Sequence, residues 1–229
     1  MDNDWALLVV DLQNDFLDKR GYYGLRRLLE LDATWRQLGP KAQALRLAAV
    51  SEDIPGGIVS AEAKKMLRNV TRAIERSRQF ERPIAFVRAV YDRSFDVLPP
   101  GLHRDPERRH FPCRPGTWGV QFVDPIRLAV EQGHADRERV FDKHTYDPFF
   151  ADTGLPAFLT EYDVRRLYVC GTETQTCVLA TAQHAALLGY HTTILDDGVW
   201  SADQTLGEAA LKMFARAFGE VCPVDAIGL

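Results

Sequence analysis

The 229-residue chain lacks the features that mark several specialised classes of protein. No apolar stretch approaches the ~20 residues needed to cross a bilayer, and the acidic start Met1-Asp2-Asn3-Asp4 does not resemble a signal peptide. A formal net charge of −4 gives no reason to expect a nucleic-acid or membrane partner. We therefore expect a protein that binds neither nucleic acid nor membranes and whose partner is a small molecule.

Cysteine is also scarce, and the chain has no Cys-x-x-Cys pair. Its four cysteines are Cys113, Cys170, Cys177 and Cys222. Such wide spacing argues against a disulfide framework and against a cysteine zinc site. Free thiols fit a reducing compartment, so the expected location is the cytoplasm.

Runs of strand length recur along the chain and alternate with helical patterns. They cover residues 5–10, 83–90, 139–143, 167–170 and 192–195, and residues 221–227 could supply a final short strand. Buried-type strands that alternate with helices are typical of a mostly parallel sheet with both faces covered. We predict one α/β domain over residues 1–229, with three layers and an open, mostly parallel sheet of about six strands.

Capping residues set the expected bounds of the helices. These helices run from Ser60 to about Gln79, from Thr153 to Tyr162, and from Ser201 or Asp203 to Phe218. Residues 17–60 are harder to interpret, because an aromatic turn at 21–24 precedes apolar residues at only roughly helical spacing. We interpret them as an excursion over the edge of the first strand. A lid, an oligomer contact and surface decoration all stay open as its role.

One stretch places a cysteine where a strand turns into a helix. Gly171 ends the strand at 167–170, residues 172–176 form a small-polar bend, and a helical pattern runs from Cys177 to Gly189. Backbone N–H groups in a first helical turn lack partners within the helix, and the helix dipole stabilises a thiolate. Cys177 alone fits either a nucleophile or a buried, inert cysteine.

Two further side chains stand at corresponding places. Asp11 follows the first predicted strand and Lys143 ends the third. Asp11 alone could cap the next element, and Lys143 alone could be a surface lysine. The carboxyl ends of parallel strands share one edge of a sheet, however, so Asp11, Lys143 and Cys177 can converge. A thiol, a carboxylate that moves its proton and an ammonium that stabilises negative charge suit nucleophilic catalysis.

Four motifs together resemble the isochorismatase-like cysteine hydrolases, a family that includes nicotinamidase, N-carbamoylsarcosine amidase, ureidoacrylate amidohydrolase and biuret hydrolase. They are residues 9–16 (Val-Val-Asp-Leu-Gln-Asn-Asp-Phe), 115–119 (Pro-Gly-Thr-Trp-Gly), 142–144 (Asp-Lys-His) and 171–178 (Gly-Thr-Glu-Thr-Gln-Thr-Cys-Val). Their order and spacing span nearly the whole chain outside residues 17–60.

The resemblance implies a catalytic triad of Asp11, Lys143 and Cys177 that hydrolyses an amide or ureide C–N bond through a thioester. It also implies a cis peptide bond between Thr172 and Glu173. The backbone N–H groups of Glu173 and Cys177 would then bind the oxyanion. Members of the family commonly form homo-oligomers, so we expect a dimer or a tetramer.

Side chains near these motifs are candidates for substrate contact. They are Gln13, Phe16, Trp118, Tyr146 and Glu173. The Pro-Gly-Thr-Trp-Gly motif leans towards the carbamoyl- and ureido-amidases, which favours a small amide or ureido substrate. A small or apolar residue usually stands where Glu173 is. Its carboxylate could point away from the oxyanion site or bind an N–H-rich or cationic substrate group, and both alternatives stay open.

The nicotinamidase branch carries an Asp-x-His metal site after its second strand. Residues 91–95 read Tyr-Asp-Arg-Ser-Phe instead, and His103 and His110 form no tight cluster with aspartate. We therefore expect no metal and no cofactor, and nicotinamidase activity is disfavoured.

Three other hypotheses compete with amide hydrolysis. They are a vinyl-ether hydrolase of the isochorismatase type, a non-catalytic domain with residues 17–60 as its interface, and a thiol redox protein that uses Cys170 and Cys177. The intact Asp11, Lys143 and Cys177 favour amide hydrolysis, and the lack of a Cys-x-x-Cys pair argues against redox activity.

Overall fold

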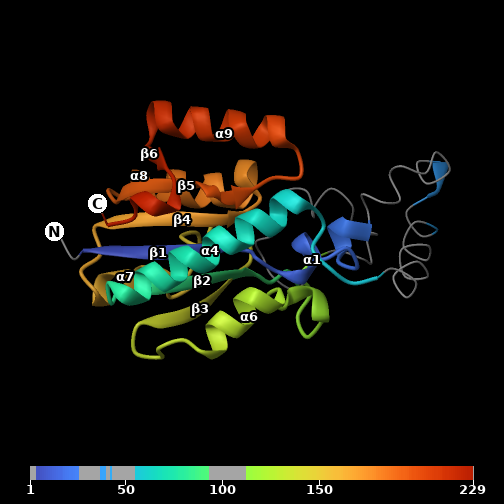
Figure 1. The fold of residues 1–229 in the computed structure, drawn as a ribbon, viewed down its shortest axis with the longest axis horizontal. Helices are drawn as coiled ribbons and strands as arrows, with labels where there is room; N and C mark the ends of the chain where they lie inside the picture. The colour runs from blue at the N-terminus through green and yellow to red at the C-terminus, as the bar shows by residue number, and fades with distance from the viewer. Residues whose placement is uncertain (1–3, 26–36, 40–41, 43–54, 93–111, 229) are drawn as a thin grey trace.

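A six-stranded sheet, parallel throughout, forms the centre of the computed structural model (Figure 1). The structure describes residues 4–25, 37–39, 42, 55–92 and 112–228. The strands are β1 (Trp5–Val10), β2 (Ile84–Ala89), β3 (Glu138–Lys143), β4 (Arg166–Thr172), β5 (His191–Trp200) and β6 (Glu220–Cys222). Their order in the sheet is β3-β2-β1-β4-β5-β6. The predicted α/β fold with an open, parallel sheet of about six strands is confirmed.

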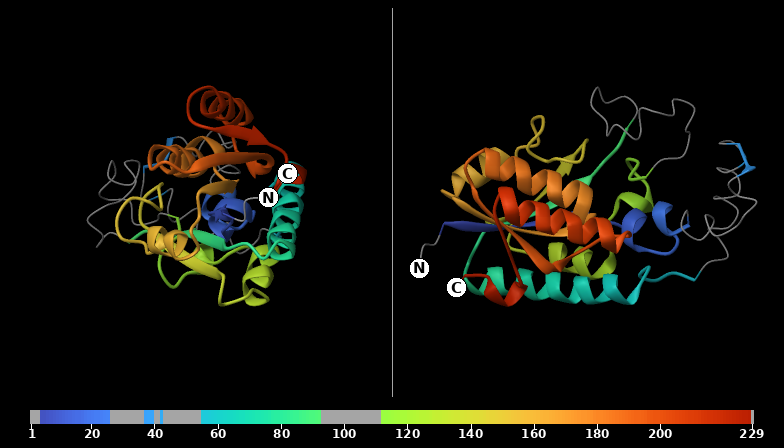
Figure 2. Two further views of the ribbon diagram at one scale, coloured as in Figure 1. Left: turned by 90° about the vertical axis from the view of Figure 1, so that its left-hand side faces the viewer. Right: turned by 90° about the horizontal axis from the view of Figure 1, so that it is seen from above.

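Helices cover both faces of this sheet, which makes three layers (Figure 2). The helices are α1 (Asn14–Leu17), α4 (Ala61–Gln79), α6 (Asp124–Glu131), α7 (Leu155–Glu161), α8 (Leu179–Leu187) and α9 (Gln204–Ala217). The helices α4 and α6 pack on one face of the sheet, and α7, α8 and α9 pack on the other. No described helix is both long and apolar enough to span a membrane.

The central strand β1 explains why the layers form. All six of its residues are buried. Alternate side chains point to opposite faces of the sheet, and helices cover both faces. Leu7 and Val9 join the core under α4 and α6, whereas Leu8 and Val10 join the core under α7, α8 and α9. A strand buried on both faces must be apolar throughout, as the sequence of β1 is.

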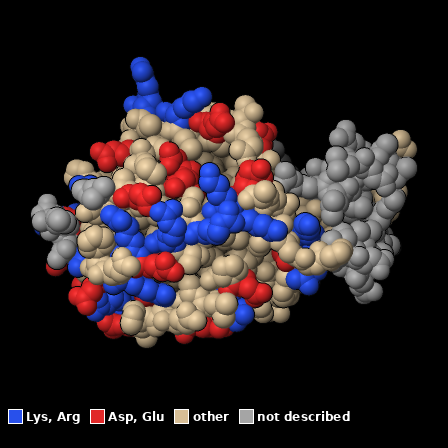
Figure 3. Space-filling model, viewed as in Figure 1, with Lys and Arg blue, Asp and Glu red and all other residues tan. Residues whose placement is uncertain are grey.

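The helix α4 shows the complementary pattern. Its buried face carries Met66, Val70 and Ile74, and Ser60 caps it by accepting a hydrogen bond from the Ala63 N–H at 3.1 Å. Its outer face forms part of a band of basic side chains interspersed with acidic ones (Figure 3). The helix begins after its cap Ser60 and ends at Gln79, so its predicted bounds are correct.

Two predicted helix starts needed correction or a choice. Asp203 caps α9 by accepting from the Leu206 N–H at 3.1 Å, so it is the cap rather than Ser201. The predicted cap Thr153 of α7 is wrong by one residue. Gly154 holds that position with a φ of 79°, a left-handed conformation that glycine adopts without strain.

The strand β5 is longer than predicted. The sequence Asp196-Asp197-Gly198 suggested a turn, yet the strand continues to Trp200. A shift of register accommodates these residues, because Val169 pairs with Ile194 whereas Gly171 pairs with Val199. The backbone carbonyl of Asp197 accepts from Asn69 Nδ2 at 2.7 Å, which ties this irregular stretch to α4.

The helix α6 was not predicted. It lies between β2 and β3, which are parallel neighbours and therefore need a crossover connection. Only Ile126 and Ala129 are buried along its eight residues, so its apolar pattern is too short to stand out.

Most of the predicted excursion at residues 17–60 lies outside the described residues. At its described ends, Asp18 and Ile58 form an isolated antiparallel bridge. Its role as a lid, an oligomer contact or surface decoration stays open.

Candidate active site

Asp11 stands immediately after β1, at the carboxyl edge of the sheet. It has a left-handed φ of 54°, which aspartate tolerates better than most residues with a Cβ atom. Its N–H donates to the Val87 carbonyl at 2.9 Å, and its carbonyl accepts from the Gln13 N–H at 2.8 Å. These bonds hold a reversal of the chain that leaves the Asp11 side chain fully buried at the end of the strand.

Lys143 is the last residue of β3 and reaches the same point from two strands away. Neighbouring strands lie about 4.8 Å apart, so a short side chain could not cross β2. The lysine Nζ lies 2.8 Å from Asp11 Oδ2, and it donates a hydrogen bond to the Thr145 carbonyl at 3.0 Å. Both side chains are fully buried, so the two charges form an ion pair without solvent.

Cys177 completes the group. It lies in a wide π-helical turn, η3 (Thr174–Val178), between β4 and α8, and is 4% exposed. Its thiol lies close enough to the Asp11 carboxylate and the Lys143 ammonium for both groups to shift its pKa. The structure therefore brings together the three residues that the sequence placed at separate strand ends.

The ionisation of this group follows from its burial. Burial raises the pKa of Asp11, and the positive charge of Lys143 opposes part of that increase. Burial alone would lower the pKa of Lys143, but the charges of Asp11 and Cys177 raise it above its usual value. Burial raises the pKa of Cys177 to about 12, and Lys143 offsets this only in part.

The resting state is therefore a neutral thiol beside an ion pair. The start of a helix stabilises a thiolate, but here burial is the larger effect on the pKa of Cys177, and the Asp11 charge adds to it. A thiolate would add a second negative charge to a site that has one positive charge and no solvent.

The bend before Cys177 begins at Gly171, which has a φ of 126°. A Cβ atom at this position would lie 2.0 Å from the Val10 carbonyl oxygen, so only glycine allows β4 to pass β1 so closely here. The next peptide bond, between Thr172 and Glu173, is cis, at the position that the family resemblance implies. Thr172 Oγ1 donates to the Trp200 carbonyl at 3.1 Å and ties the bend to the end of β5.

The Glu173 side chain is held by the chain's own donors. Its Oε2 atom accepts from Gln175 Nε2 at 3.0 Å and from the Ala202 N–H at 3.1 Å, and it lies 3.5 Å from Ser201 Oγ. Of the two alternatives that the sequence left open, this arrangement fits a carboxylate directed to the loop before α9.

We predict that Glu173→Ala lowers both stability and turnover, because it removes the link between the bend and the loop before α9. A lost charged hydrogen bond costs about 1.5–3 kcal/mol of unfolding free energy, measurable by urea denaturation. Glu173→Gln keeps an acceptor for the Ala202 N–H and should recover most of both, whereas the exposed Glu208→Ala serves as the control. Unchanged stability with altered substrate preference would instead show that Glu173 faces the substrate.

Gln13 was expected to contact substrate, and the structure gives its side chain a different role. It is fully buried, and its Nε2 donates to the carbonyls of Ala89 and Val120, both at 2.8 Å. Its Oε1 accepts from the Ala89 N–H, also at 2.8 Å. The amide is thus fully used in joining the chain after β1 to β2 and to the segment before α6.

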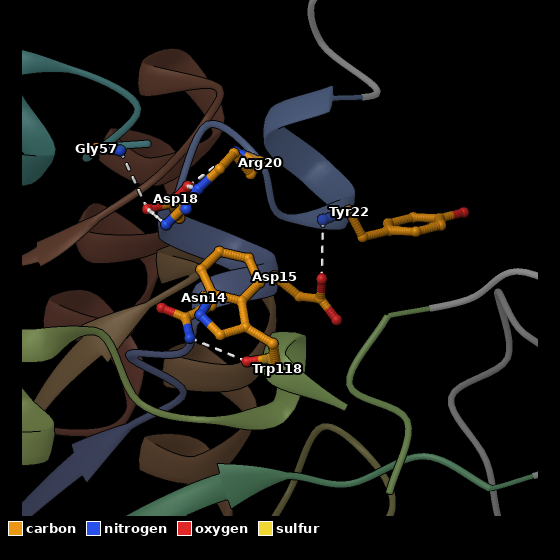
Figure 4. A network of polar contacts seen from close by, with 7 residues as sticks. All are labelled: Asn14, Asp15, Asp18, Arg20, Tyr22, Gly57 and Trp118. Carbon is orange, nitrogen blue, oxygen red and sulfur yellow. Dashed lines mark hydrogen bonds and ion pairs between the residues drawn. The ribbon is translucent and has the colours of Figure 1, made fainter. Parts of the chain in front are cut away.

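Trp118 belongs to a polar network that follows β1, in which its carbonyl accepts a hydrogen bond from Asn14 Nδ2 at 2.9 Å (Figure 4). Phe16 is 7% exposed and stacks on Tyr23 with ring centroids 5.4 Å apart. Trp118 is 41% exposed, and the Arg20 guanidinium covers one face of its ring at 4.6 Å. Asp18 in turn holds Arg20 through an ion pair at 3.0 Å.

Tyr146, the remaining candidate, is half-buried and packs against the core on the side of α7 and α8. Phe16, Trp118 and Tyr146 stay candidates for substrate contact.

Sequence reasoning missed Tyr91. It follows β2 by two residues and is 3% exposed, with its N–H donating to the Cys113 carbonyl at 2.9 Å. It directly follows the strand predicted over residues 83–90, but it was not among the candidate site residues. The strand-end rule that identified Asp11 and Lys143 also applies to Tyr91, so a signal was present in the sequence.

Two alternatives can be judged from the described residues. Cys170 and Cys177 lie in core clusters on opposite faces of the sheet, so they do not form a redox pair. The described part of the chain has no group of three histidine, cysteine or acidic side chains that could hold a metal ion. Residues 93–111, with His103 and His110, lie outside it, and the expected absence of a metal stays a prediction.

Comparison with known proteins gives the family. The model of the isochorismatase domain matches residues 5–226. The chain belongs to the isochorismatase family. The nicotinamidase of Saccharomyces cerevisiae is 36% identical over 93 residues, which span 37% of this chain and 43% of that protein. The ureidoacrylate amidohydrolase RutB of Serratia proteamaculans is 26% identical in an alignment 234 residues long. This alignment covers 96% of this isochorismatase-family chain and 79% of RutB.

Solved structures agree on the fold of this family. The nicotinamidase PncA of Bacillus subtilis superposes with a TM-score of 0.70 at 22% identity, covering 96% of this chain and 99% of that one. The N-carbamoylsarcosine amidase of Thermoplasma acidophilum gives a TM-score of 0.65 at 23% identity, covering 99% of both chains.

Proposed function

We propose that this isochorismatase-family protein hydrolyses the C–N bond of a small amide or ureido compound through a thioester on Cys177. The observation that carries the proposal is the buried ion pair of Asp11 and Lys143, whose two groups both shift the pKa of the buried Cys177 thiol. The names of its relatives, a nicotinamidase and a ureidoacrylate amidohydrolase, support the same reaction class.

Acylation begins when the Cys177 sulfur attacks the substrate carbonyl carbon. The thiol proton moves to Asp11 as the sulfur–carbon bond forms, and the carbonyl oxygen becomes an oxyanion. The N–H groups of Glu173 and Cys177 bind that oxygen. When the carbonyl re-forms, the C–N bond breaks and the leaving nitrogen takes the proton from Asp11.

Deacylation repeats these steps with water. Asp11 accepts a proton from the attacking water, the carbon–sulfur bond breaks, and the departing sulfur regains the proton. Lys143 keeps Asp11 ionised despite its burial and stabilises negative charge on sulfur during both half-reactions. The cycle ends with the neutral thiol in which it began.

The intact Asp11, Lys143 and Cys177 favour this reaction over vinyl-ether hydrolysis and over a non-catalytic role. We also propose that the protein forms a homo-oligomer, a dimer or a tetramer, and works in the cytoplasm without a metal or cofactor. Similarity to the family and the scattered free cysteines support these points.

Intact-mass spectrometry tests the proposal. The protein is mixed with acetamide, N-methylurea, N-carbamoylglycine or nicotinamide and quenched in acid, which preserves a thioester. We expect an acyl adduct on Cys177 with at least one compound, together with release of ammonia or amine. Release without an adduct in rapid-quench samples would contradict the thioester, and no release across a broadened panel would contradict the hydrolase.

A further inference from the structure

The Tyr91 hydroxyl is buried without a hydrogen-bond partner among the described residues. Among the described residues, the other buried side-chain atoms without a hydrogen-bond partner are the two Asp11 oxygens. The charge of Lys143 compensates these oxygens. Within the described part of the chain, no hydrogen-bond partner compensates the burial of the Tyr91 hydroxyl. A buried polar group without a partner costs stability, so it needs an explanation.

Tyr91 lies beside the catalytic group. It follows the end of β2. This strand lies between β3 and β1, so the Lys143 side chain crosses it to reach Asp11. The N–H of the preceding residue, Val90, donates to the Lys143 carbonyl at 2.9 Å. Burial raises the pKa of Tyr91 well above its usual value, and the charges of Cys177 and Asp11 raise it further, which places the phenol within electrostatic reach of both.

The chemistry of the hydroxyl limits what it can bind. The phenol stays neutral at physiological pH, so it can donate one hydrogen bond and accept others. The Asp11 carboxylate is nearby, so a negatively charged substrate group at this point would be repelled. A neutral group that offers N–H donors or a carbonyl oxygen fits better.

We propose that the Tyr91 hydroxyl binds a second, uncharged polar group of the substrate, the ureido nitrogen next to the carbonyl that Cys177 attacks. This inference rests on the proposed amide or ureide hydrolysis and narrows its substrate class from plain amides to ureides. It also accounts for the buried hydroxyl, because the bound substrate supplies the missing partner.

The variant Tyr91→Phe keeps the ring and removes only the hydroxyl. We expect kcat/KM for N-methylurea to fall about tenfold, mainly through KM, and that for acetamide, which lacks the second nitrogen, to change less than twofold. The melting temperature should stay the same or rise, because the buried hydroxyl had no partner. If the hydroxyl were only structural, its removal would lower the melting temperature and change kcat/KM for both substrates equally. That result would overturn the proposal.

Tyr168→Phe is the matched control. Tyr168 is also buried, but its hydroxyl accepts a hydrogen bond from the Gly228 N–H at 3.3 Å. Its removal should lower the melting temperature and leave both kcat/KM values unchanged. The two variants thus predict opposite effects on stability and activity.

Alkylation of Cys177 separates failure of this inference from failure of the proposed function. If the wild type hydrolyses neither substrate, rates of modification by iodoacetamide, an amide, and by methyl methanethiosulfonate, which is not one, are compared. Tyr91→Phe should lower the first rate relative to the second by several fold. An unchanged ratio would overturn the role of Tyr91 as a group that binds neutral polar ligands.

Discussion

Cys177→Ala is expected to lower kcat for amide or ureide hydrolysis by at least about 10³-fold. The described catalytic group offers no second nucleophile, since its other members are a carboxylate and an ammonium already paired at 2.8 Å. Loss of the sulfur removes the thioester route altogether. The measurement is ammonia or amine release, with intact mass confirming that no adduct forms on the variant.

The control for this experiment is Cys222→Ser. Cys222 is half-buried at the end of β6, away from the carboxyl ends of β1, β3 and β4. It should leave kcat within about twofold of the wild type. If Cys177→Ala kept the wild-type rate, the cysteine would have no part in the chemistry.

Lys143→Met is expected to abolish turnover and to destabilise the fold by roughly 3–5 kcal/mol at neutral pH, because it leaves a buried carboxylate without its partner. Both side chains of the pair are fully buried, so solvent screens neither charge. Urea denaturation followed by tryptophan fluorescence measures the loss. The double variant Asp11→Asn with Lys143→Met removes both charges and should recover most of the stability without recovering activity.

The pH dependence of this loss has a definite sign. Without Lys143, burial holds the pKa of Asp11 even further above its value in the unfolded chain. The folded state then binds the proton more tightly than the unfolded state, so stability increases as pH falls through the Asp11 pKa. The deficit of Lys143→Met should therefore shrink in acid. A deficit independent of pH would mean that lost packing, not the unpaired charge, is its cause.

The same variant tests how Lys143 acts on the nucleophile. Lys143 lowers the pKa of Cys177 against the larger effect of burial. Its removal should move the pH profile of Cys177 alkylation to higher pH. An unchanged profile would exclude Lys143 from stabilising the sulfur.

The position of the catalytic group could be predicted because it depends on topology. Asp11, Lys143 and Cys177 each adjoin the carboxyl end of a strand, and parallel strands bring those ends to one edge. Tyr91 obeys the same rule and could have been found by applying it to every strand. The inner strands β1, β2 and β4 were recognisable because burial on both faces demands largely apolar sequences.

The directions of side chains could not be predicted in this way. The Gln13 amide donates hydrogen bonds to the carbonyls of Ala89 and Val120. The Glu173 carboxylate accepts a hydrogen bond from the Ala202 N–H. These partners lie far along the chain, so no local pattern reveals them. The pKa of Cys177 also depends on packing, since burial raises it more than Lys143 lowers it.

The neutral resting thiol has a consequence for the durability of the enzyme. Peroxides and other oxidants attack the thiolate form of cysteine, and a thiol with a pKa of about 12 supplies little of it near neutrality. Cys177 is also only 4% exposed. Under the proposed mechanism, Cys177 therefore resists oxidation until a substrate carbonyl is in place and Asp11 takes its proton.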